Sequence, residues 1–174
     1  MTEVTVSKET VFKGKIMEVE VHQVEAKGGP AVREIVQHGP AVCLVVKRDN
    51  GNFIFIKQFR KAVERVVFEV CAGNCDPGEP EIESAKRELT EETGFVADKI
   101  CPLGTIYPGV GYCTERIEVF YAEVSRQGAT NFDLDEDIET LEVSREEMDN
   151  LIRAGKIQDG KTLAAWALFE KVVG

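Results

Sequence analysis

Histidine is scarce in this sequence of 174 residues, which contains two, His22 and His38. The cysteines add little to a metal framework, because Cys71 and Cys75 form no Cys-x-x-Cys pair and no histidine is close to them in sequence. Structural zinc sites need four Cys or His ligands, usually at short and fixed spacings. This scarcity argues against a zinc-dependent fold, and we expect these cysteines to act as small buried side chains.

The sequence also lacks a disulfide framework, a membrane span and a secretion signal. Its five cysteines are odd in number and scattered, which fits reduced thiols in the cytosol. No apolar run approaches the roughly 18 residues that a transmembrane helix needs. The N-terminus does not show the basic and then apolar pattern of a signal peptide. We therefore expect a cytoplasmic protein without a membrane partner.

Positive charge is in deficit, with 21 Lys and Arg against 31 Asp and Glu and a net charge of −10. This argues against a nucleic-acid partner, because affinity for a phosphate backbone depends on basic side chains. A small anionic substrate is still compatible with this charge, since a bound divalent metal reverses the local sign. The length and the 43% apolar content suit one globular domain with a small extension.

The first 38 residues predict a small antiparallel sheet. Residues 1–14 resemble short edge strands or a loosely held arm, Met17 to His22 alternate between apolar and polar side chains, and Val32 to Gln37 read as a returning strand. A sheet this small has little core of its own, so we expect it to pack on something else. We divide the chain into an N-terminal β-sheet region at 1–38 and a second domain at 39–174.

The second domain alternates strand and helix patterns. The nearly continuous apolar run Ala41 to Lys47 predicts a strand covered on both faces, and Asp49 to Asn52 predicts a hairpin turn. Further strands are expected at Phe53–Phe59, Val66–Cys71, Ile100–Tyr107, Ile117–Val124 and Ile138–Val143, and helices at 80–93, 144–153 and Lys161–Val172. The order predicts an α/β fold in which a mixed β-sheet is sandwiched between helices, an α/β/α arrangement, with the small N-terminal antiparallel sheet attached.

The segment 73–95 begins as a turn and continues as a helix. Pro80 suits the first helical turn, where its missing N–H is not needed, and Gly94 suits the left-handed position just past the helix end. Apolar residues at helical spacing form one stripe that we expect to face a core: Ile82, Ala85 and Leu89.

Three carboxylates lie on an adjacent face of the same helix, at Glu88, Glu91 and Glu92. Like charges three or four residues apart destabilise a helix by roughly 0.2–0.5 kcal/mol per pair. A bound cation therefore accounts for their spacing better than a solvated acidic face does. Oxygen ligands of this kind favour Mg²⁺ or Mn²⁺ over zinc.

A second acidic run, Asp133 to Asp137, invites comparison with a calcium-binding loop. It does not fit that template, because Ile138 stands where the loop needs glycine and Ser144 where it needs glutamate. We expect this run to be a solvated loop.

The segment 73–95 resembles the Nudix box, written Gx5Ex7REUxEExGU with U a bulky aliphatic or aromatic residue. Every fixed position is filled, by Gly73, Glu79, Arg87, Glu88, Glu91, Glu92 and Gly94, and the U positions by Leu89 and Phe95. The resemblance implies hydrolysis of a phosphoanhydride bond with Mg²⁺, or Mn²⁺, as the cofactor.

The same resemblance implies roles for individual residues. Glu88, Glu92 and Glu91 are expected to bind metal together with the main-chain carbonyl of Ala72, and Glu91 can alternatively orient a water. Arg87 is expected to hold a carboxylate in place. The number of metal ions stays open.

A general base is needed besides the metal ligands. In the ADP-ribose pyrophosphatase group this base usually comes from a loop after the box. Glu115 matches that location, because it ends a glycine-rich loop that begins at Pro108, and Glu118 is the alternative.

The sequences around the box resemble ADP-ribose and nucleoside-diphosphate-sugar pyrophosphatases. The matching segments are Arg33-Glu34, Gln58-Phe59-Arg60, Phe68 to Gly73 and Asp159-Gly-Lys-Thr-Leu163. By resemblance, Arg60 and Glu69 lie near the phosphate and sugar of the substrate. Arg33 or Glu34 contacts it as well, from the other subunit of a homodimer that exchanges its N-terminal sheet.

The resemblance thus implies that the protein cleaves ADP-ribose or a related nucleoside diphosphate sugar into a nucleoside monophosphate and a sugar phosphate. Two alternatives stay open. One is the same fold acting on GDP-mannose, NADH or diadenosine polyphosphates. The other is a non-catalytic, nucleotide-sensing Nudix domain, for which an eroded box would be expected.

Overall fold

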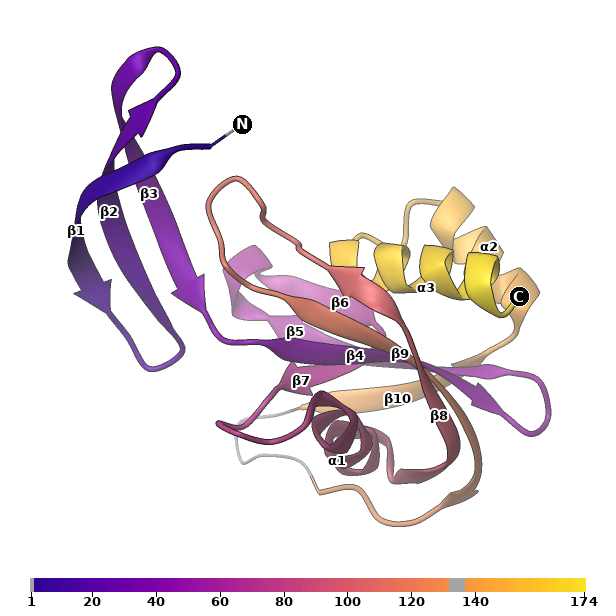
Figure 1. The fold of residues 1–174 in the computed structure, drawn as a ribbon. Helices are drawn as coiled ribbons and strands as arrows, with labels where there is room; N and C mark the ends of the chain where they lie inside the picture. The colour runs from indigo at the N-terminus through magenta and orange to yellow at the C-terminus, as the bar shows by residue number, and fades with distance from the viewer. Residues whose placement is uncertain (1, 132–136) are drawn as a thin grey trace. The chain divides into compact units, whose positions relative to one another are not determined.

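The computed structural model describes residues 2–131 and 137–174. Its contacts group the chain into two compact units (Figure 1). The smaller unit consists of Met1–Pro40 and Tyr107–Arg116, and the larger unit of Ala41–Ile106 and Ile117–Gly174. The segment 107–116 therefore belongs with the N-terminal residues, although it follows the predicted box helix in sequence.

The smaller unit contains an antiparallel sheet in the order β1-β2-β3. Its strands are β1 Val4–Lys13, β2 Met17–Ala26 and β3 Gly29–His38. The small N-terminal sheet is therefore confirmed, but the first residues form one ten-residue strand rather than short strands or a loose arm. Every residue of β1 is exposed, because β1 lies at the edge of a sheet with few side chains to cover it.

A polar cluster occupies part of this sheet, where a larger domain would have an apolar core. Glu20 is 7% exposed. Its carboxylate accepts hydrogen bonds from Lys8 at 2.8 Å and from Gln37 at 2.8 Å, and its other contact is His22 at 2.8 Å. These bonds, that of Lys8 first, lower the pKa of Glu20 to about 2. The buried carboxylate is thus fully partnered, as buried charges must be.

The segment 107–116 is hydrogen-bonded to the end of β3. Val36 donates its N–H to the Tyr112 carbonyl at 2.7 Å and accepts from the Thr114 N–H at 2.9 Å. The N–H of His38 donates to Thr114 Oγ1 at 3.0 Å. These bonds explain why this segment groups with the N-terminal sheet.

The larger unit is built on a mixed sheet in the order β10-β5-β4-β9-β8, with β6 paired to β5 and β7 paired to β4. Its strands are β4 Ala41–Arg48, β5 Phe53–Arg60, β6 Arg65–Glu69, β7 Cys71–Asn74, β8 Phe95–Ile106, β9 Ile117–Gln127 and β10 Ile138–Val143, and a 3-10 turn, η1, spans Lys61–Val63. The β4–β9 pair is parallel, and the other pairs of this sheet are antiparallel. The predicted mixed sheet is confirmed.

Helices cover both faces of this sheet, as predicted (Figure 1). They are α1 Glu81–Thr93, α2 Arg145–Arg153 and α3 Gly160–Val172. Successive residues of β4 point to opposite faces: Cys43 packs in the layer of Trp166 from α3, and Leu44 packs in the layer of Leu89 from α1. The uninterrupted apolar run of β4 follows from this double coverage.

The ends of α1 largely match the sequence prediction. Gly94 is the C-cap residue, with φ 72°, in the left-handed region that favours glycine. Pro80 is the N-cap residue and not part of the first turn, so its expected position was off by one residue. Ala85 and Leu89 are fully buried, but Ile82 is 36% exposed and does not belong to the core stripe.

One predicted strand is wrong in its extent. Val66–Cys71 is not a single strand, because β6 ends at Glu69 and β7 starts at Cys71. The two parts pair with different neighbours: Glu69 lies opposite Ile56 of β5, and Cys71 lies opposite Leu44 of β4. Val70 stands between them. The acidic run predicted as a solvated loop lies mostly outside the described residues, which omit 132–136.

Candidate active site

Gly73 and Glu88 meet where β7 passes α1. A Cβ atom added at Gly73 would lie 2.0 Å from the Glu88 carboxyl carbon and 2.1 and 2.2 Å from its two oxygens. Real Cβ atoms essentially never approach other heavy atoms so closely. A side chain at position 73 would therefore force the Glu88 carboxylate out of its place against this strand, which gives the first fixed position of the box motif a physical reason.

Arg87 is the centre of a carboxylate cluster on the same side of α1. It donates to Glu88 Oε1 at 2.7 Å, to Glu91 Oε2 at 3.1 Å and to Glu79 Oε2 at 3.1 Å. It also donates to the main-chain carbonyl of Asn74 at 3.0 Å. Arg87 thus contacts three carboxylates in this structure, and its role in the site stays a prediction.

The charges in this cluster stabilise one another. Burial alone would lower the pKa of Arg87, but its hydrogen bonds with Glu79 and Glu88 raise it. The pKa of Glu79 is lowered, first by the hydrogen bond from Arg87 and then by that from the buried Ser84 hydroxyl at 2.7 Å. Arg87 and Glu79 are therefore both charged at neutral pH.

Glu92 lies deeper than the other box glutamates and is 4% exposed. Its Oε2 accepts the N–H of Ala72 at 3.0 Å, so the carboxylate is tied to the residue whose carbonyl was predicted as a metal ligand. The neighbouring Cys71 thiol is fully buried, and burial first and then the nearby Glu92 raise its pKa. That thiol is therefore protonated and unreactive at neutral pH.

The donor set suits a hard cation. The carboxylates of Glu88, Glu91 and Glu92 and the Ala72 carbonyl offer only oxygen, the atom that Mg²⁺ and Mn²⁺ prefer. Among the described residues, no three side chains of His, Cys, Asp or Glu are arranged to hold a metal ion, and Glu88 and Glu91 instead bind Arg87. The chemistry of the set therefore fits a divalent metal, and two of its carboxylates are shared with the arginine.

A second charged cluster lies at the β5–β6 end of the sheet and the start of α3. Arg60 binds Glu69 through two parallel hydrogen bonds, from Nε and Nη2, each 2.7 Å long. Glu69 is 1% exposed and also accepts from Lys161. Burial opposes its ionisation, yet the bonds from Arg60 and Lys161 hold the pKa of Glu69 below its ordinary value. The two predicted substrate-binding residues, Arg60 and Glu69, thus lie in direct contact.

An open pocket of about 330 Å³ lies over this second cluster. Val63 and Val67 form an apolar part of its lining. The charged part consists of Arg60, Arg65, Glu69, Asp159 and Lys161. Lys161 received no role from the sequence, although the Asp159–Leu163 segment had been noted for its resemblance. No local sequence pattern indicates a role for Lys161, because its partner Glu69 lies 92 residues away in sequence.

The remaining predicted site residues belong mostly to the smaller unit. Arg33 binds Glu3 through Nε at 3.0 Å and Nη2 at 2.5 Å, and Glu34 lies opposite Val21 in the sheet. Glu115 lies 4.0 Å from Nδ1 of His38. The alternative base, Glu118, is on β9 of the larger unit, where Thr105 donates to it at 2.6 Å.

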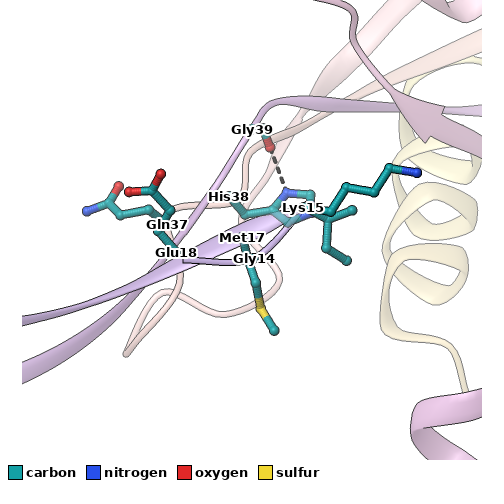
Figure 2. A pocket seen from close by; sticks show the side chains of 8 residues that line it. Gly14, Lys15, Met17, Glu18, Gln37, His38 and Gly39 are labelled. Atoms are coloured by element: carbon teal, nitrogen blue, oxygen red, sulfur yellow. Dashed lines mark hydrogen bonds between the residues drawn. The ribbon is translucent and has the colours of Figure 1, made fainter. Parts of the chain in front are cut away.

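Figure 2 shows a shallow hollow beside His38 in the smaller unit. Lys15 from the β1–β2 turn and Glu18 from the start of β2 line it together with Gln37 and His38 from the end of β3. The His38 ring bonds to the Gly39 carbonyl at 2.8 Å. This contact fixes the orientation of the ring beside Glu115.

Comparison with known proteins assigns the family. The model of the NUDIX domain matches residues 37–166, about three quarters of the sequence. The chain therefore belongs to the Nudix family, as its box predicted.

Several relatives align over most of the chain. The sequence is 38% identical to an ADP-ribose pyrophosphatase of Bacillus subtilis (strain 168) over 95% of this chain and 91% of that protein. It is 30% identical to a methanol dehydrogenase activator of Bacillus methanolicus over 94% and 90%. It is 32% identical to a GDP-mannose pyrophosphatase of Enterobacter sp. (strain 638) over 82% and 81%.

A solved structure supports the fold. The crystal structure of an ADP compounds hydrolase superposes with a TM-score of 0.87 and 23% identity, covering 98% of this chain and 94% of that one. Within the described part of the chain, each helix is too short or too polar to span a membrane.

Proposed function

We propose that this protein hydrolyses the pyrophosphate bond of ADP-ribose or a related nucleoside diphosphate sugar, with Mg²⁺ or Mn²⁺ as its cofactor. The products are a nucleoside monophosphate and a sugar phosphate. The observation that carries the proposal is the complete box, in which Gly73 makes room for Glu88 and Ala72 binds Glu92. The relative from Bacillus subtilis, alike over nearly the whole chain, supports the choice of substrate.

In this proposal the box residues form the metal site. Glu88, Glu91, Glu92 and the Ala72 carbonyl hold the cation, and Arg87 keeps the carboxylates of Glu88 and Glu91 oriented when no cation is bound. When bound, a divalent metal neutralises phosphate oxygens and lowers the pKa of a coordinated water. The chain's own task is to place oxygen donors around one point with little reorganisation.

The general base in the proposal is Glu115. It lies near the end of the 107–116 segment, which is hydrogen-bonded to β3, and its carboxylate lies 4.0 Å from His38 Nδ1. Because Glu115 is not one of the proposed metal ligands, its carboxylate stays available to take a proton from the attacking water. Glu118 is the alternative.

Substrate binding is assigned to Arg60 and Glu69 at the pocket and to Arg33 and Glu34 on β3. The Arg60 guanidinium suits a phosphate oxygen and the Glu69 carboxylate suits sugar hydroxyls. We assign Arg33 and Glu34 to the partner's site in a homodimer that exchanges its N-terminal sheet. The five cysteines are free thiols, which supports a reducing compartment such as the cytoplasm.

A second candidate is hydrolysis of GDP-mannose, favoured by the relative of that name from Enterobacter. NADH and diadenosine polyphosphates are further candidate substrates of the same site. The relative named as a methanol dehydrogenase activator supports a third possibility, a domain that acts on another protein.

One experiment separates these functions. Purified protein is incubated with Mg²⁺ and, separately, ADP-ribose, ADP-glucose, GDP-mannose, NADH and diadenosine polyphosphates, and monophosphate release is followed. We expect the highest kcat/KM for ADP-ribose. A preference for GDP-mannose would select the second candidate, and no hydrolysis of any compound would contradict the proposed function.

Two variants test the assigned residues in the same assay. Glu92→Gln is expected to lose about 10²-fold in activity while staying folded, as on removal of a metal ligand. Glu115→Gln is expected to lose at least about 10²-fold in kcat while keeping its affinity for Mn²⁺. Glu83→Gln, on the same helix but at a variable position of the box and paired with Lys86, is the control and should behave as wild type. Normal turnover by Glu115→Gln would move the base to Glu118.

A further inference from the structure

The main chain passes from one strand to the next between two residues of the proposed site. Glu69, a proposed substrate ligand, is the last residue of β6, and Ala72, a proposed metal ligand, is the second residue of β7. Val70 lies between the two strands and belongs to neither ladder. It is fully buried, so its N–H has to find a partner inside the protein.

The hydroxyl of Thr162 provides that partner. Thr162 lies in the first turn of α3 and is fully buried, and its Oγ1 accepts the Val70 N–H at 2.9 Å. The same hydroxyl donates to Asp159 Oδ2 at 2.6 Å. A threonine hydroxyl has one proton to donate, so its donor is used on Asp159 while a lone pair holds the strand.

Asp159 anchors this hydroxyl to the start of the helix. Its Oδ2 accepts the Thr162 N–H at 3.0 Å, which makes Asp159 the N-cap of α3. It also accepts from Lys161 Nζ at 2.9 Å, and Lys161 in turn binds Glu69. The first turn of α3 therefore contacts this strand junction twice, at the Val70 main chain and at the Glu69 side chain.

We propose that Thr162 is a positioning residue of the active site, whose hydroxyl fixes the main chain at Val70 between β6 and β7 and thereby places Glu69 for the substrate and Ala72 for the metal together. The proposal assigns Thr162 itself no contact with the substrate or with the metal. The proposal rests on the roles given to Glu69 and Ala72 in the proposed function. It makes one prediction that those roles alone do not: a single buried hydroxyl on α3 affects both metal and substrate affinity.

The test compares Thr162→Val with Thr162→Ser. Valine has the shape of threonine without the hydroxyl, and serine retains the hydroxyl. Mn²⁺ affinity is measured on the protein without substrate, from the electron paramagnetic resonance signal of free Mn²⁺, and KM and kcat are measured with ADP-ribose. We expect Thr162→Val to raise the Kd for Mn²⁺ and the KM about tenfold each, the lower end of losses seen on removing partners of metal ligands. Thr162→Ser should stay within about twofold of wild type in both.

A control separates positioning from loss of stability. Ser144→Ala removes the N-cap hydroxyl of α2, which belongs to a complete capping box at a different helix. It is expected to lower the Tm while leaving the Kd for Mn²⁺ and the KM unchanged. If Thr162→Val does not fold, as judged by circular dichroism, Thr162→Ala removes the same hydroxyl and takes its place.

The outcomes are distinct from those of the proposed function. Wild-type protein that binds Mn²⁺ but hydrolyses none of the nucleotides would overturn the proposed activity, and the Mn²⁺ titrations of the Thr162 variants would still decide the role of this residue. Hydrolysis by wild type together with unchanged Mn²⁺ affinity and KM in Thr162→Val would overturn the positioning role alone.

Discussion

Gly73 shows how a missing side chain shapes this site. The glycine is not needed for an unusual backbone angle, since its φ lies outside the left-handed region. It is needed because the Glu88 carboxylate occupies the space where a Cβ would stand. The glycine at position 73 thus makes room for the Glu88 carboxylate and is not required by its own backbone conformation.

Gly73→Ala is therefore expected to displace Glu88 and disable metal binding. We expect a loss of about 10–100-fold in Mn²⁺ affinity and a matching loss in kcat/KM, as when a metal ligand is misplaced. Manganese titration and the ADP-ribose assay measure the two effects. Gly28→Ala, where an added Cβ meets nothing within 4 Å, is the matched control. A Gly73→Ala protein with wild-type metal affinity would show that Glu88 moves aside at no cost.

At this scale the sequence predicted what depends on spacing along one helix. The contact of Arg87 with Glu91 follows from positions four residues apart on one helix, and the C-cap Gly94 follows from local chemistry. Lys161 could not be assigned in the same way. Its contact with Glu69 depends on how α3 packs on the sheet, and no local pattern encodes that.

The β4–β5 hairpin shows how a turn is fixed by a neighbouring strand. Glu142 of β10 accepts hydrogen bonds from Arg48 at 2.8 Å, Asn50 at 2.7 Å and Asn52 at 2.9 Å. Its carboxylate therefore binds residues at both ends of the turn. These bonds, that of Asn52 first, lower the pKa of Glu142 from 4.5 to about 2. The sequence predicted the turn from Asp49 to Asn52 but not the carboxylate that holds it.

The lowered pKa predicts a specific pH dependence of stability. A carboxylate with a depressed pKa stabilises the fold above its unfolded pKa of 4.5 and loses that contribution as the pH falls toward 2. Glu142→Gln should therefore be about 1 kcal/mol less stable than wild type at pH 7. The difference should shrink as the pH is lowered from 4.5 to 3, in urea unfolding followed by circular dichroism.

The control for this prediction is Glu139→Gln on the same strand, whose carboxylate lies 3.7 Å from Lys57 and is 66% exposed. That change is expected to have little effect on the free energy of unfolding at either pH, because exposed ion pairs contribute little. A stability difference for Glu142→Gln that stays constant down to pH 3 would contradict the role of its charge.

Strand extents also belong to the scale of elements. The apolar pattern of Val66–Cys71 predicts extended chain correctly, and the structure splits it because β6 and β7 pair with different strands. Pairing partners are set by the sheet as a whole. Local sequence therefore predicts the conformation of this stretch but not its division, although that division separates Glu69 from Ala72.

The whole molecule combines a well-packed unit with one that has little apolar core. In the described residues of the smaller unit, Val24 is the one buried apolar side chain, while Phe12, Val19 and Val36 lie in register across its three strands and Phe12 is 52% exposed. Such a face favours burial against a second copy of the chain. It supports the homodimer that the resemblance implied from sequence.

The exchange of sheets in that dimer predicts complementation between inactive subunits. If Arg33 serves the site of the partner, Arg33→Ala disables the partner's site, whereas Glu92→Gln disables its own. A heterodimer of the two variants then has one intact site, with the box of the Arg33→Ala subunit and the arginine of the Glu92→Gln subunit. Random pairing of co-expressed subunits makes half of the dimers heterodimers, so we expect roughly a quarter of wild-type activity.

The complementation is measured with differently tagged subunits that are co-expressed, purified through both tags and assayed with ADP-ribose. Purification through both tags isolates heterodimers, so their activity should rise to roughly half of wild type. Arg87→Ala paired with Glu92→Gln is the control, because both changes lie in the box of their own subunit and leave every site defective. Heterodimers of Arg33→Ala and Glu92→Gln no more active than that control would show that Arg33 does not complete the partner's site.

Because Arg33 is held by Glu3 within its own sheet, the whole sheet would carry it to the partner, and Glu3→Gln should weaken the complementation without abolishing dimer formation.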